Sequence, residues 1–327
     1  MKMKYVFVAT SAGVLLLILA SCGVLKPAPV PTQTVEALPA TGIQYQFVTN
    51  KLLIPTTQAQ TQAFALNVDG DLQQRPDNMF GDLFTLLASA AQGIELQSAL
   101  DQAVNTGQLV SLHVVKANDP LNDPSVSWSI FQGQKTKSAP SFDGSDKFTL
   151  DPAAPTNSLI VGTLTNGHFT GGPGSTRVQM VLLGGQVDVD LIGVRLEADF
   201  SAKGCANGRL GGGVTVDEFR GKLLPALTDG LNKIIKTDES AAKSLLPAFD
   251  SDRNGTITIQ ELERNTLLML AISPDLDLLD ASGKFNLPLY GVIHAPFTYG
   301  WTPTIVYKYK SCKFIPPKAE TKFLSSP

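Results

Sequence analysis

The fold is decided by the stretch Gln186-Val187-Asp188-Val189-Asp190-Leu191, which begins a strand-forming run that extends to Phe200. Its apolar side chains alternate with carboxylates. Successive side chains of a β-strand point to opposite faces, so the pattern gives one buried and one solvated face. The run therefore predicts a strand of an antiparallel sheet.

Weaker strand patterns and several helical patterns lie on both sides of this run. Strands are expected at 43–48, 52–54, 63–67, 109–115, 126–131, 158–164, 177–183, 285–292 and 304–309. Helices are expected after Asp77 as a cap and at 94–104, 215–236, 240–249 and 258–271. Thr215 and Glu218 match a capping box, and Pro225 should kink or split its helix. These elements predict an α+β fold in which an antiparallel sheet or sandwich occupies most of 43–200.

The glycine-rich stretch 204–213 raises the question of a phosphate-binding loop. It lacks the Gly-Lys-Ser/Thr ending of a P-loop and the glycine spacing of a dinucleotide-binding turn. We therefore expect a loop that leads from the sheet into the helix at 215–236.

A twelve-residue stretch within the helical part has the layout of an EF-hand calcium loop. It reads Asp250-Ser251-Asp252-Arg253-Asn254-Gly255-Thr256-Ile257-Thr258-Ile259-Gln260-Glu261. Side-chain oxygens occupy positions 1, 3, 5 and 9, glycine occupies position 6 and glutamate position 12, as such loops require. The predicted calcium ligands are Asp250, Asp252, Asn254, Thr256 through its carbonyl, Thr258 and Glu261. With its flanking helices the EF-hand would span about 240–271.

The alternative is an acidic loop that only caps the exiting helix. EF-hands usually pair through an aliphatic residue at position 8, here Ile257, yet the chain contains no second twelve-residue match. Outside the cytosol a weak site, with a dissociation constant on the order of 10⁻⁴ to 10⁻³ M, can still fill. We therefore expect one structural calcium rather than a sensor.

A second metal site is a weaker possibility. Asn67, Asp69, Asp71 and Asp77 resemble an Asp-rich calcium loop, although the spacing of the glycine is wrong for the motif above. A turn followed by a helix cap explains the same residues.

Residues 1–21 have the features of a signal peptide: Lys2 and Lys4 precede an apolar run that is short for a membrane span. The run ends in Leu19-Ala20-Ser21-Cys22, which resembles the lipobox of bacterial lipoproteins. The resemblance implies that Cys22 becomes the first mature residue and carries acyl chains such as palmitate, which anchor the protein to the membrane. Gly23, where inner-membrane retention uses aspartate, favours the outer membrane of the cell envelope.

Further marks resemble a group of bacterial lipoproteins of unassigned activity. They are Val68-Asp69-Gly70-Asp71, Asp77-Asn78-Met79-Phe80-Gly81, the run from Gly208 to Leu227, and Pro274-Asp275-Leu276-Asp277-Leu278 after the calcium loop. The resemblance implies no particular activity. The residues themselves predict a proline-rich tether at 22–42, one domain at 43–315 and a flexible, polar tail at 316–327.

The cysteines, the net charge and the motifs of the chain limit the classes of function that it can have. With Cys22 acylated, Cys205 and Cys312 are expected to form a disulfide, with two buried thiols as the alternative. The net charge of −3 and the absence of a Lys/Arg run argue against a nucleic-acid partner. No catalytic serine or zinc motif is present.

The expected function is a calcium-stabilised binding or scaffold module with a protein or glycan partner. A secreted or periplasmic hydrolase and a glycan-binding protein are the alternatives.

Overall fold

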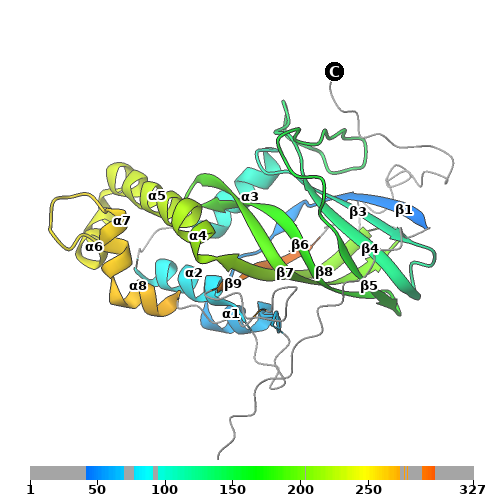
Figure 1. Cartoon of the computed structure of the whole chain (residues 1–327). Coiled ribbons are helices and arrows are strands. Elements are labelled where there is room, and N and C mark those ends of the chain that lie inside the picture. The colour runs from blue at the N-terminus through cyan, green and yellow to red at the C-terminus, as the bar shows by residue number, and fades with distance from the viewer. Residues whose placement is uncertain are drawn as a thin grey trace, which may run out of the picture.

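The computed structural model describes residues 42–69, 77–90, 95–202, 204–272, 276, 278 and 289–298. Within them nine strands form one antiparallel sheet in the order β1-β3-β4-β5-β6-β7-β8-β9-β2 (Figure 1). The strands are β1 (Ile43–Val48), β2 (Lys51–Leu52), β3 (Ser111–Ala117), β4 (Asp123–Gln132), β5 (Ile160–Thr165), β6 (His168–Leu182), β7 (Gly185–Ser201), β8 (Gly204–Thr215) and β9 (Leu289–Thr298). The predicted α+β class with an antiparallel sheet is confirmed. The described strands belong to one sheet rather than to a two-sheet sandwich.

Strand β7 contains the alternating run and lies between β6 and β8. Val189 and Leu191 are buried, whereas Asp188 and Asp190 are half-buried on the opposite face. The carboxylate of Asp190 accepts two hydrogen bonds from Arg177 of β6, at 2.6 and 2.7 Å. The polar face of this strand therefore carries an ordered side-chain network.

The sheet is strongly curved, and its two edge strands, β1 and β2, are close neighbours in the chain. β1 pairs with β3 at one edge and β2 pairs with β9 at the other, yet only Thr49 and Asn50 separate β1 from β2. Aromatic side chains from distant strands meet inside the curve. The rings of Tyr45 and Phe47 on β1 stand edge-on to Phe200 of β7, with centroids 5.2 and 5.9 Å apart.

Helices cover this sheet and gather toward one end of it, where α5, α6, α7 and α8 lie together (Figure 1). The helices are α1 (Gln58–Phe64), α2 (Met79–Ala90), α3 (Leu96–Asn105), α4 (Val216–Glu218), the π-turn η1 (Phe219–Leu223), α5 (Leu224–Thr237), α6 (Glu239–Phe249), α7 (Ile259–Arg264) and α8 (Thr266–Ala271). Helix α5 contacts β6 and β7 as well as α6 and α7. It therefore connects the candidate metal loop to the sheet. No helix in the described ranges is long and apolar enough to cross a membrane.

Two elements differ in type from the sequence-based expectation. The expected strand at 63–67 does not form: Ala63 and Phe64 end helix α1, which Thr57 caps by accepting a hydrogen bond from the Gln60 N–H, and Leu66 makes only an isolated antiparallel bridge with Asp77. The glycine-rich stretch expected as a loop is strand β8. A side chain at its Gly212 would be tightly crowded, since an added Cβ would lie 3.0 Å from that of Leu191. Here glycine serves close strand packing rather than a turn.

Three helix predictions are refined. The helix expected at 215–236 forms, but it is interrupted by a π-turn at 219–223, just before Pro225. Thr215 caps it, but the Glu218 carboxylate accepts the Asp190 N–H at 3.0 Å instead of completing the capping box. The helix expected at 258–271 is interrupted at Asn265. The expected strand at 304–309 and the segments 1–41 and 316–327 lie outside the described residues.

Candidate metal centre

The candidate loop joins the C-terminus of α6 to the N-terminus of α7. Helix α6 begins at its cap Asp238 and continues through Pro247 to Phe249, with the Asp250 N–H bonded to the Leu246 carbonyl. Proline so close to the end of the helix removes one backbone donor without preventing the last turn. Asp250 thus follows the helix directly, with its side chain buried beside the loop.

The turn itself is built from carboxylate and amide oxygens that accept backbone N–H groups. Asp250 accepts the N–H groups of Asn254 and Gly255, at 3.1 and 2.8 Å. Asp252 also accepts the Asn254 N–H, at 3.0 Å, and Asn254 Oδ1 accepts the Thr256 N–H, at 2.8 Å. Gly255 has φ +84°, in the left-handed region where glycine carries no Cβ penalty. These contacts hold the first half of the loop in a compact turn.

Glu261 closes the second half of the loop. Its Oε2 accepts the Thr258 N–H at 2.9 Å while Thr258 Oγ1 accepts the Glu261 N–H, which is a complete capping box for α7. Its Oε1 accepts the N–H groups of Ser251 and Asp252, at 2.7 and 3.2 Å. Burial alone would raise the pKa of Glu261, but the hydrogen bonds from Thr258, Asp252 and Ser251 outweigh it and lower the pKa from 4.5 to about 2. This carboxylate therefore stays ionised.

These side chains form an acidic group that can hold a metal ion. One oxygen each from Asp250, Asp252 and Glu261 lies within 4.8 Å of the others. Within the described part of the chain, none of the three forms an ion pair with lysine, arginine or histidine. Three carboxylates this close repel one another unless a cation lies between them. Oxygen-only ligands of this kind suit hard divalent cations.

The other predicted ligands lie on the same loop in supporting positions. Asn254 and Thr256 are exposed, and Thr258 is the cap of α7. Each already participates in the hydrogen bonds that shape the turn. The structure thus brings the three predicted carboxylates together and places the three neutral residues on the turn around them.

Asn232 of α5 is a residue of this centre that the sequence analysis missed. Its side-chain amide donates to the Ile257 carbonyl, at 2.6 Å, and its Oδ1 accepts the Ile257 N–H, at 2.9 Å. Ile257 itself is buried in the main core. The two residues lie 25 positions apart, and no local motif connects them.

The second candidate site has a different environment. Asp77 accepts the N–H groups of Val68 and Asp69, at 2.7 and 3.4 Å, and Arg195 donates to the Val68 carbonyl at 2.9 Å. Burial lowers the pKa of Arg195, and the charges of Asp69 and Asp77 oppose that shift. These carboxylates therefore lie close to a cation of the protein. Asn67 lies in the same segment, and Asp71 falls outside the described residues.

Helix α2 is capped one residue later than expected. Asn78 Oδ1 accepts the Gly81 N–H at 3.0 Å, which is the bond of an N-cap. Asp77 instead uses its carboxylate on the preceding segment.

Two of the three cysteines lie outside the described residues. Cys205 is buried on β8, where it pairs with Phe200 of β7. Its expected partner Cys312 and the expected lipidation site Cys22 are not among the described residues. The disulfide and the anchor remain predictions.

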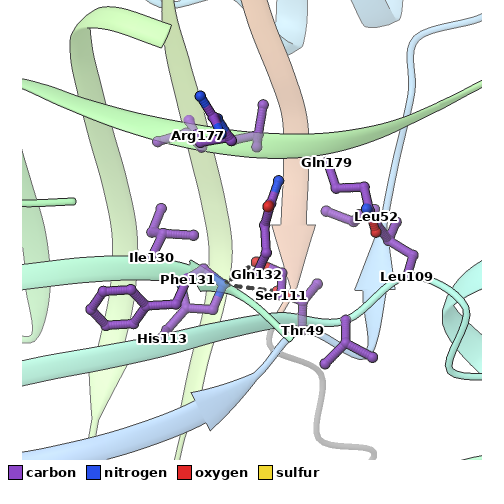
Figure 2. Close-up of a pocket in the computed structure, with 13 residues that line it drawn as sticks. Thr49, Leu52, Leu109, Ser111, His113, Ile130, Phe131, Gln132, Arg177 and Gln179 are labelled. Carbon is purple, nitrogen blue, oxygen red and sulfur yellow. Dashed lines mark hydrogen bonds between the residues drawn. The ribbon is translucent and has the colours of Figure 1, made fainter. Parts of the chain in front are cut away.

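A small cavity lies inside the curve of the sheet. It measures about 30 Å³, and Figure 2 shows Thr49, His113, Gln132 and Arg177 among its lining residues. That volume suffices for one or two waters, whereas pockets for small molecules measure roughly 300 to 1,000 Å³. Burial lowers the pKa of His113 well below 6.5, so the ring is neutral at pH 7. A cavity of this volume suits ordered water molecules.

Comparisons with known proteins add no assignment. No family model, no curated protein sequence and no solved structure matches the chain. The function of the chain is therefore inferred from its residues and their geometry.

Proposed function

We propose that this protein is a lipid-anchored bacterial envelope protein that binds one calcium ion through an EF-hand-type loop at 250–261. The observation that carries the proposal is the group of three carboxylates, Asp250, Asp252 and Glu261, within 4.8 Å of one another at the junction of two helices. The ligand set also includes Asn254, Thr256 and Thr258. The leader and Cys22 support the envelope location, in the outer membrane.

Calcium fits this ligand set better than the other common divalent ions. The predicted ligands are all oxygens, and the loop supplies more of them than magnesium normally takes from protein alone. The group contains no thiolate or imidazole, the ligands that favour zinc or copper. An extracellular or periplasmic compartment can fill a weak calcium site.

The proposed role of the ion is structural. Phe249 precedes the loop, Ile257 lies within it and Leu262 follows it, and all three belong to the main hydrophobic core. Because these side chains are already packed, an ion would stabilise the arrangement of α6 and α7 rather than expose a new surface. The stabilised body would serve as a binding or scaffold module. The small cavity gives no support to the hydrolase and glycan-binding alternatives.

Calorimetric titration of the mature protein with calcium chloride tests the proposal. We expect one binding event per chain, abolished in Glu261→Gln. The matched control is Glu263→Gln, which changes an exposed glutamate on the same helix, paired with Arg220 at 3.5 Å. Absence of binding heat in the unmodified protein, or equal heats in it and Glu261→Gln, would refute calcium binding at this loop.

The anchor is tested separately. Expression of the full chain in a bacterium with labelled palmitate should give a labelled protein in the membrane fraction. Cys22→Ser should remove the label and leave an unprocessed leader. Equal labelling of both proteins would contradict acylation at Cys22.

A further inference from the structure

The side chain of Asn232 forms a two-bond clamp on the backbone of Ile257. A carboxamide has one acceptor oxygen and a donor nitrogen, as a peptide group does. Asn232 directs the donor at the Ile257 carbonyl, at 2.6 Å, and the acceptor at the Ile257 N–H, at 2.9 Å. Both backbone groups of this residue are thereby satisfied by one side chain.

Ile257 is the eighth loop residue, the position through which EF-hands pair with a second loop. In this chain its side chain is 1% exposed, within the core. A backbone donor and acceptor left unpaired at such a place would destabilise the loop. The chain has no second loop of this type, so these bonds must come from elsewhere.

We infer that Asn232 takes the place of a partner loop, and that it is a positioning residue which makes the single calcium loop complete within one chain. The inference rests on the proposed calcium function and deepens it. The loop then needs neither a second hand nor a second copy of the protein. The bound state is accordingly a monomer with one non-cooperative ion.

Helix α5 connects this clamp to the sheet. Gly230, two residues before Asn232, lies so close to the β6–β7 turn that an added Cβ would stand 2.5 Å from the Cβ of Leu183. The helix cannot shift toward the sheet, and Asn232 is therefore presented to Ile257 from a fixed support. The ion site, α5 and the β6–β7 hairpin form one connected unit.

Two variants and one control test the inference. Asn232→Leu keeps the branched shape of the side chain and removes both bonds, and Asn232→Ala removes them with less risk of steric conflict. Thr237→Ala is the control, since it deletes an exposed polar group whose hydrogen bonds stay within α5. Each protein is titrated with calcium in a calorimeter and sedimented with and without calcium. Amide hydrogen exchange at Ile257 is measured in the metal-free state.

We expect the Asn232 variants to bind calcium roughly tenfold more weakly, because two hydrogen bonds that preorganise the loop are lost. Their Ile257 amide should exchange faster even without metal, while amides far from the loop keep their rates. General destabilisation would instead accelerate exchange over the whole chain. The unmodified protein and Thr237→Ala should remain monomeric with calcium bound.

The outcomes separate the two proposals. If the unmodified protein binds no calcium, the proposed function fails and this inference fails with it. If it binds calcium and the Asn232 variants bind equally well, the inference alone is overturned. Dimerisation of the unmodified protein on calcium addition would also overturn it.

Discussion

Glu261 Oε1 accepts the backbone N–H of Ser251 at 2.7 Å, which ties the twelfth residue of the loop to the second. The loop is therefore closed by hydrogen bonds between its two ends. The same carboxylate lies within 4.8 Å of oxygens from Asp250 and Asp252. The hydrogen bonds shape the loop, and the accumulated charge provides the attraction for a cation.

This arrangement predicts that the negative charge of Asp252 matters chiefly when calcium is present, because an asparagine there keeps the oxygen that accepts the Asn254 N–H. Asp252 is exposed, so Asp252→Asn should change the metal-free free energy of unfolding by less than about 0.5 kcal/mol. Calcium affinity should fall about tenfold. At a calcium concentration well above the dissociation constant, the calcium-dependent stabilisation should then drop by about 1.4 kcal/mol. Thermal unfolding with calcium and with a chelator measures both quantities.

Asp229→Asn is the control for that comparison, because it removes an exposed carboxylate from α5. It should reproduce the calcium response of the unmodified protein. An equal calcium response in Asp252→Asn would contradict a role for Asp252 as a ligand.

Two glycines provide a second prediction about backbone conformation. Gly255 has φ +84°, and an added Cβ there would meet nothing within 4 Å. Gly255→Ala should therefore cost about 1 to 2 kcal/mol from the left-handed backbone alone. Gly221, in the π-turn, also has open space but no positive φ. Gly221→Ala should stabilise the protein by about 0.5 to 1 kcal/mol.

Urea unfolding of both variants, without metal, measures these effects. Opposite signs are the expected result. Destabilisation of similar size at both positions would show that something other than backbone conformation controls them.

The disulfide prediction follows from Cys205 on β8 and from Cys312. Under denaturing conditions without reductant, the mature protein should incorporate no alkylating reagent at either residue. Closure of so long a loop contributes about 4 to 5 kcal/mol in the chain-entropy model, so reduction should lower the unfolding temperature markedly. Two alkylated thiols, detected by mass spectrometry, would exclude the bridge.

Local patterns in the sequence predicted the parts of the structure that local forces determine. The alternation in β7 and the strand at Ile43–Val48 follow from side-chain periodicity. The spacing from Asp250 to Glu261 predicted the three carboxylates that the structure brings together.

The misses have a common physical origin in contacts between distant segments. Strand β8 is rich in glycine, which has low strand propensity, and it forms because β7 and β9 pair with it on both sides. The strand order that places β1 and β2 at opposite edges, although only two residues separate them in the chain, depends on the pairing of the whole sheet. Asn232 reaches Ile257 only after α5 has packed beside the loop. None of these contacts leaves a periodic pattern in the sequence.

His113 provides the last prediction, a pH dependence of stability. The indole N–H of Trp128 donates to His113 Nδ1 at 3.1 Å, and Thr49 and Ser111 hydroxyls lie 3.0 Å from Nε2. The indole can only donate, so Nδ1 accepts and the proton of the neutral ring is on Nε2. Protonation of Nδ1 would place its N–H opposite the indole N–H of Trp128, with no acceptor between the two donors.

The sign of the effect follows from the direction of the pKa shift. Burial lowers the pKa of His113 in the folded protein well below 6.5, whereas the unfolded chain takes up a proton near pH 6.5. Below that pH the unfolded state binds more protons, so stability should fall as pH decreases from about 6.5, by at most about 1.4 kcal/mol per pH unit. His113→Asn keeps an acceptor near Nδ1 and cannot titrate. Urea unfolding between pH 7 and pH 5 should give a smaller slope for this variant. Equal slopes would mean that His113 titrates alike in both states, against the burial that the structure assigns to it.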